Sequence, residues 1–149
     1  MHYCSNCPVQ KLIFYNAALD VAHAVKLSHL LHPPSSNIVS LVLGNIQLRV
    51  SAVVAIAGAL CHGFSKLEQL VLESCEIGSV GAAALFEALC HNKSLWKLDL
   101  SKNHISDSIC GTLGQALLVN DRLAVLCLSD NALTDRGVLG FLAPALQCA

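Results

Sequence analysis

Apolar residues recur along the chain at two different spacings, and segments with one spacing alternate with segments with the other. Leu70 and Leu72 alternate with polar or outward positions, which is typical of a half-buried strand. Leu85 and Leu89 follow at the i,i+4 spacing, which places both on one face of a helix. The same change of period occurs several times, so the pattern predicts strand, turn, helix and short loop in succession.

The pattern is an internal repeat. Copies of LxxLxLxx(N/C)x(L/I) begin at equal intervals, at Leu67, Leu95 and Leu123. A further copy begins at Ile38 and a weaker one at Val9, each at nearly the same interval before the next. Repeats of this length are typical of stacked architectures. We predict an N-terminal tail over 1–8 and a repeat domain over 9–149, with units of about 9–37 (degenerate), 38–66, 67–94, 95–122 and 123–149.

Such a unit has too small a core to bury its apolar face alone, so stability comes from contacts between neighbouring units. Parallel pairing of the successive strands follows from this stacking. Asn103 and Asn131 occupy the turn position of the pattern, where a short amide is suited to bond the turn backbone of a neighbouring coil. Cys75 fills the same position as a weaker donor.

Polar residues also mark the expected helix ends. Ser106 and Thr134 share one repeat position just before a helix and suit an N-cap. Asn92 and Asn120 fall just past their helices, where a left-handed residue is tolerated.

The segment LDLSKNHISDSICGTLGQAL (98–117), echoed at 70–89 and 126–146, resembles the leucine-rich repeats of the ribonuclease-inhibitor subfamily. The Cys-type turn at Cys75 beside the Asn-type turn at Asn103 is similar to the repeat region of NOD-like receptors. This resemblance implies an α/β solenoid, a horseshoe arc with parallel strands on its concave face and helices on its convex face. It also implies protein binding without enzymatic activity. No capping unit is recognisable before Ala149, so we expect a fragment or a short isoform of a longer repeat protein.

Composition narrows the class of protein further. Among 149 residues, 54% are hydrophobic and 13% charged, with a net charge of −1, which excludes a disordered chain. The few lysines and arginines are scattered, which argues against nucleic-acid binding. The apolar stretch at 50–61 is shorter than the roughly 20 residues of a membrane span, and 1–10 lacks the features of a signal peptide. We therefore expect a cytoplasmic protein whose cysteines remain thiols.

The strand positions between the buried leucines predict the partner-binding surface. In the repeat they form three columns on the concave face, and Trp96, the single tryptophan, lies beside them. An aromatic residue with apolar and charged neighbours is the composition of a binding hot spot. An alternative is that Trp96 packs on Glu68 and the neighbouring strand. The predicted partner-binding residues are Val42, Val71, Glu73, Trp96, Lys97, Asp99 and Cys127.

The predicted helix at 51–62 is unusual because it carries no charge on any face. A helix on the surface normally has a polar stripe. We expect this helix to be covered, either by another part of a longer protein or by a partner.

Metal and catalytic chemistry have little support in the sequence. Cys4 and Cys7 form half of a zinc site, and the remaining ligands would have to come from His2 with His23 or His29. A cysteine nucleophile would require His104 and Asp107 beside Cys110, with a helix N-terminus lowering the pKa of the thiol. The chain has no glycine-rich phosphate-binding loop. We predict no catalytic residue, no metal site and no cofactor.

The sequence thus favours a non-enzymatic module that binds a protein through the concave strand face, in regulation or innate immune signalling. One alternative is a GTPase regulator resembling the activating protein of the Ran GTPase, which stimulated GTP hydrolysis would reveal. Another is a structural fragment that acts by assembling with another chain, including a second copy, through its uncapped ends. Light scattering would distinguish that assembly from a monomer.

Overall fold

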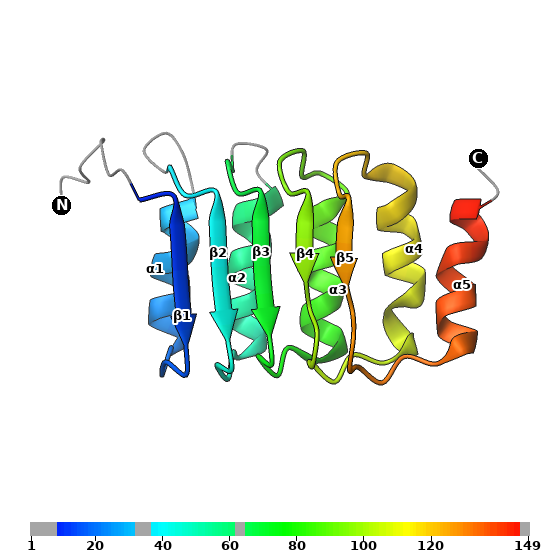
Figure 1. Cartoon of the computed structure of the whole chain (residues 1–149), viewed down its shortest axis with the longest axis horizontal. Coiled ribbons are helices and arrows are strands. Elements are labelled where there is room, and N and C mark those ends of the chain that lie inside the picture. The colour runs from blue at the N-terminus through cyan, green and yellow to red at the C-terminus, as the bar shows by residue number, and fades with distance from the viewer. Residues whose placement is uncertain (1–8, 32–36, 62–64, 147–149) are drawn as a thin grey trace.

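A computed structural model describes residues 9–31, 37–61 and 65–146 of the chain. Strands and helices alternate along this part, with one short 3₁₀ helix before the fourth α-helix (Figure 1). The elements are β1 (Lys11–Tyr15), α1 (Val21–Leu31), β2 (Ser40–Gly44), α2 (Val50–Cys61), β3 (Gln69–Glu73), α3 (Gly78–Leu89), β4 (Lys97–Asp99), η1 (Asp107–Ile109), α4 (Cys110–Val119), β5 (Val125–Cys127) and α5 (Asp135–Leu146).

The strands of the described part form one parallel sheet in the order of the sequence. The register pairs Lys11 with Ser40, Ser40 with Gln69, Gln69 with Lys97 and Lys97 with Val125. The interval between partners along the chain is in each case the interval between successive sequence repeats. Each strand therefore adds one coil to the stack at an equivalent position.

The sheet covers one side of the molecule and the helices cover the other (Figure 1). The row of helices extends farther along the stack than the row of strands, so the strands lie on the inner, concave side. This arrangement is the α/β solenoid that the repeat pattern predicts. No helix in the described part of the chain has the length and apolar character needed to cross a bilayer.

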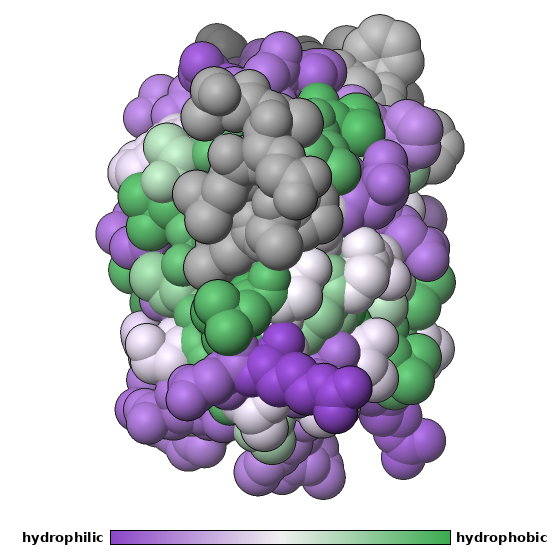
Figure 2. All heavy atoms as spheres, turned by 90° about the vertical axis from the view of Figure 1, so that its right-hand side faces the viewer, coloured by the Kyte–Doolittle hydropathy of each residue, from purple (hydrophilic) through white to green (hydrophobic). Residues whose placement is uncertain are grey.

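The core lies between the sheet and the helices. Alternate strand residues such as Leu41, Leu43, Leu70 and Leu72 are fully buried because each points toward the helices. Leu126, in the last strand, is only half-buried. In Figure 2, which faces the C-terminal end of the stack, hydrophilic residues gather at the top and bottom and apolar residues lie between them. Coils in the middle of the array are thus covered by a neighbouring coil on each side, whereas the core residues of the last coil are less completely buried.

The predicted asparagine bonds between coils are confirmed. Asn103 is fully buried, and its Nδ2 donates to the backbone carbonyl of Leu72 at 2.6 Å. Its Oδ1 accepts from the amides of Cys75 at 2.9 Å and Ile77 at 3.3 Å. Asn131 repeats this arrangement one coil later, because its Oδ1 accepts from the amide of Asn103 at 2.9 Å.

The predictions for the helix ends are correct in part. Thr134 caps α5 by accepting from the amide of Gly137 at 3.3 Å. Ser106 precedes η1, but its hydroxyl bonds Ser79 and Ser108 and not the amides of the helix. The Ser106 hydroxyl therefore bonds the preceding coil, through Ser79, and does not cap the helix.

Asn92 and Asn120 do not adopt the left-handed backbone that is tolerated at their positions. Neither residue has a positive φ, and Asn120 is extended. Their side chains explain these positions, since each donates to a carbonyl of the preceding coil: Asn92 to Leu60 at 3.0 Å and Asn120 to Leu89 at 2.6 Å. Left-handed residues occur instead at the other end of the coil, shortly after each strand: Asn16, Asn45, Ser74, Lys102 and Asp130.

The uncharged helix α2 is partly exposed to solvent, and its covering by another part of a longer protein or by a partner stays a prediction. It packs against α1 on one side and α3 on the other, in addition to the sheet. Its buried residues include Ala52, Val53, Ile56 and Leu60. The solvent-facing part is therefore narrow, and Val54 remains 48% exposed in it.

Candidate protein-binding surface

The strand residues that point away from the helices form an open face of the sheet. Because side chains alternate along a strand, the residues between the buried leucines lie on this concave face. The strand register arranges them in three rows that run across the strands. The first row is Lys11, Ser40, Gln69, Lys97 and Val125, and its first four members are here called the donor row; the central row is Ile13, Val42, Val71, Asp99 and Cys127; the turn-side row is Tyr15, Gly44 and Glu73.

The first three members of the central row form an apolar strip. Ile13 is 53% exposed, and Val42 and Val71 are half-buried beside it. Tyr15 is 54% exposed, and its ring lies over Gly44 so closely that a Cβ at position 44 would collide with it. A glycine at this point thus lets an aromatic ring lie flat across the sheet next to the strip.

Toward the C-terminal strands the face becomes polar, and its acidic groups already have partners. Lys102 donates to Glu73 in an ion pair of 2.7 Å that joins two coils. This hydrogen bond with Glu73 raises the pKa of the Lys102 ammonium. Asp99 accepts from both the amide and the hydroxyl of Ser101, at 3.0 and 2.7 Å.

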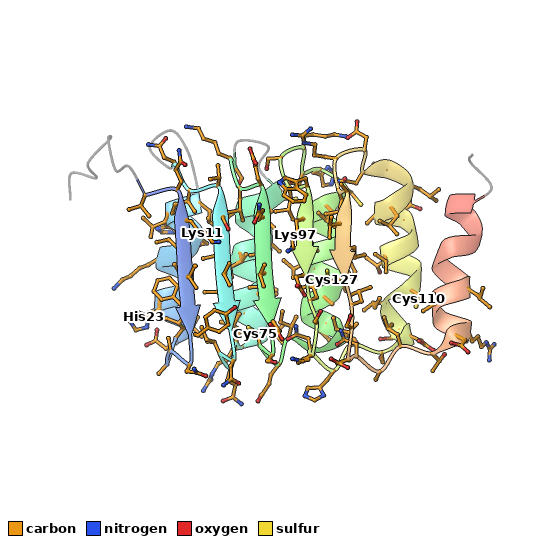
Figure 3. The ribbon with its side chains drawn as sticks, viewed as in Figure 1. Lys11, His23, Cys75, Lys97, Cys110 and Cys127 are labelled. Carbon is orange, nitrogen blue, oxygen red and sulfur yellow. The ribbon has the colours of Figure 1, made fainter. Side chains whose placement is uncertain are left out.

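The donor row differs because its polar side chains lack partners. Ser40 is 6% exposed, and its hydroxyl is the buried side-chain polar atom without a hydrogen bond in the described part of the chain. Lys11 and Lys97 belong to none of the ion pairs among the described residues. Both lysines lie toward the beginnings of their strands, at the same level of the sheet (Figure 3).

The structure brings six of the seven predicted binding residues onto this face. Val42, Val71, Asp99 and Cys127 share the central row, with Lys97 and Glu73 on either side. Trp96 precedes β4 and is half-buried, and its backbone joins the ladder by donating to Glu68 and accepting from Ala124. Whether any of these seven residues contacts a partner stays a prediction.

Three residues of the concave face, Ile13, Tyr15 and Ser40, are not among the seven predicted binding residues. Ile13 and Tyr15 lie in the weakest repeat, yet they are the most exposed apolar residues of the sheet. Ser40 looks like an ordinary polar strand residue, and only its burial between Lys11 and Gln69 distinguishes it. The repeat register places all three on the concave face, but no sequence signal reports their exposure.

The structure also bears on the chemical candidates. Burial, together with the nearby Asp107, raises the pKa of the Cys110 thiol, the opposite of the lowered pKa that a cysteine nucleophile would require. Asp107 instead binds the next coil: it accepts from the amide of Thr134 at 2.8 Å, and bonds with Thr134 lower the pKa of its carboxyl. Burial likewise raises the pKa of the Cys75 thiol to about 11.

Metal binding finds no support in the described ranges, which contain no group of three or more histidine, cysteine, aspartate or glutamate side chains arranged to hold an ion. His23 bonds Asp20 at the beginning of α1. His2, Cys4 and Cys7 lie outside the described residues.

Comparisons with known proteins agree with the fold. The family model described as "Leucine Rich repeat" matches residues 65–86 and 91–114. A search among curated proteins gave no significant match. The solved structure of actin-binding site 2 of leiomodin-1 is similar, with 21% sequence identity and a TM-score of 0.58. The similarity covers 65% of this chain and 57% of the leiomodin chain, and at this identity it is a similarity of fold.

Proposed function

We propose that this leucine-rich-repeat solenoid is a non-enzymatic protein-interaction module, and that it binds its partner through the concave face of the sheet. The observation that carries this proposal is the composition of that face. It combines an apolar strip with exposed aromatic and charged side chains, and its backbone is fixed by parallel pairing on both sides of β2, β3 and β4.

Two properties of the face suit protein recognition. Ile13 and Tyr15 expose large apolar surfaces that a partner would cover with a gain of about 25 cal/mol per Å² of apolar area. The neighbouring strands β2 to β4 are paired on both sides, so fewer degrees of freedom are lost when a partner binds across them. Polar groups surround the strip, as at the rim of a protein interface.

The repeat length and the helix in each coil also support a place in the ribonuclease-inhibitor subfamily. We propose that binding takes place in the cytoplasm. A regulatory or innate immune role would follow from the partner, which the experiment below identifies.

The test compares the same substitution on the two faces of the molecule. Val71→Glu places a charge in the apolar strip, and Val80→Glu places it on α3, at a residue that is 70% exposed on the helix side. Each variant and the parent chain would be fused to a proximity-labelling enzyme in cells. Thermal unfolding of the purified proteins verifies that both variants remain folded.

We expect a defined set of proteins to be labelled by the parent and by Val80→Glu, and to lose most of its labelling with Val71→Glu. Labelled proteins that depend on Val80 and not on Val71 would place the binding surface on the helices. Labelling that is insensitive to both substitutions would contradict concave-face binding as well.

A further inference from the structure

The donor row is the part of the concave face whose polar side chains have no hydrogen-bond or ion-pair partner among the described residues. It consists of Lys11, Ser40, Gln69 and Lys97, which are neighbours across four strands. All four side chains carry hydrogen-bond donors, and none forms a side-chain hydrogen bond or ion pair with another described residue. Glu68 accepts from the amide of Lys97 through its backbone carbonyl, but its carboxylate makes no ion pair with that lysine.

Burial makes this lack of partners significant. A buried polar group without a hydrogen bond costs roughly 1–3 kcal/mol, and native proteins contain few of them. Ser40 is more than nine-tenths buried, whereas Gln69 and Lys97 are half-buried and Lys11 is exposed. Groups that the chain itself leaves unsatisfied are suited to bonds with a ligand.

The contrast with the other side of the face defines the ligand's charge. Glu73 is bound by Lys102, and Asp99 accepts from Ser101, so the acidic groups are satisfied within the chain. Lys11 and Lys97 flank the apolar strip on the donor-row side without an ion pair among the described residues, and the Asp99 carboxylate, also without an ion pair, bounds the strip beyond Val71. A partner with carboxylates complements the two lysines, whereas a basic partner would be repelled by them.

The spacing of the rows adds a geometric condition. Neighbouring strands lie about 4.8 Å apart, so Lys11 and Lys97, three strands apart, are about 14 Å from each other along the stack. Ile13, Val42 and Val71 lie parallel to them, about 7 Å away along the strands, since residues i and i+2 share a face.

From these observations we infer that the concave face binds an acidic, apolar segment of a protein. Its carboxylates would lie along the donor row, with Ser40 and Gln69 donating between the lysines, and its apolar side chains would cover Ile13, Val42 and Val71. This inference rests on the proposed function and adds the chemistry of the partner to it.

The probe is a phage-displayed library of random peptides, selected on the purified full chain. We expect the bound peptides to be enriched in aspartate or glutamate next to large apolar residues. For a selected peptide, Lys97→Glu should weaken binding about tenfold, and raising the salt concentration should weaken binding to the parent chain. Ser40→Ala should weaken it by a smaller factor.

Lys26→Glu is the matched control, because it changes the net charge equally at an exposed position of the helix α1. It should leave the affinity unchanged, and an equal loss with Lys26→Glu would overturn the inference, since only the net charge would then matter.

The two proposals fail in different ways. Peptides without acidic residues that depend on Val71 and not on Lys97 would overturn the inference about the partner and leave concave-face binding intact. Peptides that depend on neither residue, or selection of no peptide at all, would count against both.

Discussion

Single asparagines do much to hold adjacent coils in register. The side chain of Asn103 uses both its amide donor and its carbonyl acceptor on the backbone of the preceding coil, in a site with no exposure to water. In such a site no solvent is available to replace the lost bonds. Asn131 makes equivalent bonds in the last coil but remains half-buried.

Asn103→Ala should therefore destabilise the protein by about 2–4 kcal/mol, because it leaves the amides of Cys75 and Ile77 unpaired in the core. Asn131→Ala provides the comparison, with an expected loss of about 1 kcal/mol, since water reaches that turn. Denaturant unfolding monitored by circular dichroism measures both. Equal losses would mean that burial does not determine the strength of these bonds.

At the scale of the element, close packing of neighbouring helices depends on small residues. Gly81 in α3 is buried, and a Cβ there would lie 2.6 Å from Cγ2 of Ile77 and 3.3 Å from Cγ1 of Val53 in α2. Gly111 in α4 has open space at the same atom and a helical backbone.

Opposite effects are thus expected from the same substitution in two helices. Gly81→Ala should lower the free energy of unfolding by about 1–2 kcal/mol through overpacking. Gly111→Ala should raise it by about 0.5–1 kcal/mol, because alanine loses less backbone entropy in a helix. Denaturant unfolding curves of the two variants measure both changes in the free energy of unfolding. A stabilised Gly81→Ala variant would show that α2 and α3 separate easily.

The sequence predicts the strands and helices well for a physical reason. Leucines such as Leu70 and Leu98 must face a shared core in every coil, so their period appears directly in the sequence. The left-handed turn residues were less visible, since asparagines such as Asn16 and Asn45 are common in that conformation whereas serine and lysine, as at Ser74 and Lys102, are not. Their conformation is imposed by backbone bonds between coils, such as the amide of Lys102 donating to Ser129 at 2.9 Å.

The composition of the concave face was predictable from the sequence in outline and less so in its detail. The alternation of side chains along a strand is enough to predict, from the sequence alone, that Val42 and Val71 lie on the concave face. The ring of Tyr15 over Gly44 and the burial of Ser40 depend on side chains from several coils at once. A single repeat pattern contains no information on such combinations.

For the molecule as a whole, stability should vary along the stack. Each coil contacts its neighbours only, so an array of this kind is least stable where a neighbour is lacking. Leu70 and Leu72 in β3 are fully buried, whereas Leu12 in β1 and Leu126 in β5 are only partly buried.

Amide hydrogen exchange of the chain followed by mass spectrometry should show this gradient. Peptides from β3 are expected to exchange most slowly, and those from β1 and β5 faster, because local opening at the ends costs less free energy. Uniform protection across the sheet would instead indicate that all the coils open together.

The direction of the asparagine bonds has a consequence for biosynthesis. Asn92, Asn103, Asn120 and Asn131 all reach toward a coil that precedes their own in the sequence. On the ribosome the earlier segment emerges first. Each newly made coil thus brings an asparagine whose side chain bonds the backbone of a coil that has already been translated. The array can grow by successive docking of coils in the order in which they are synthesised.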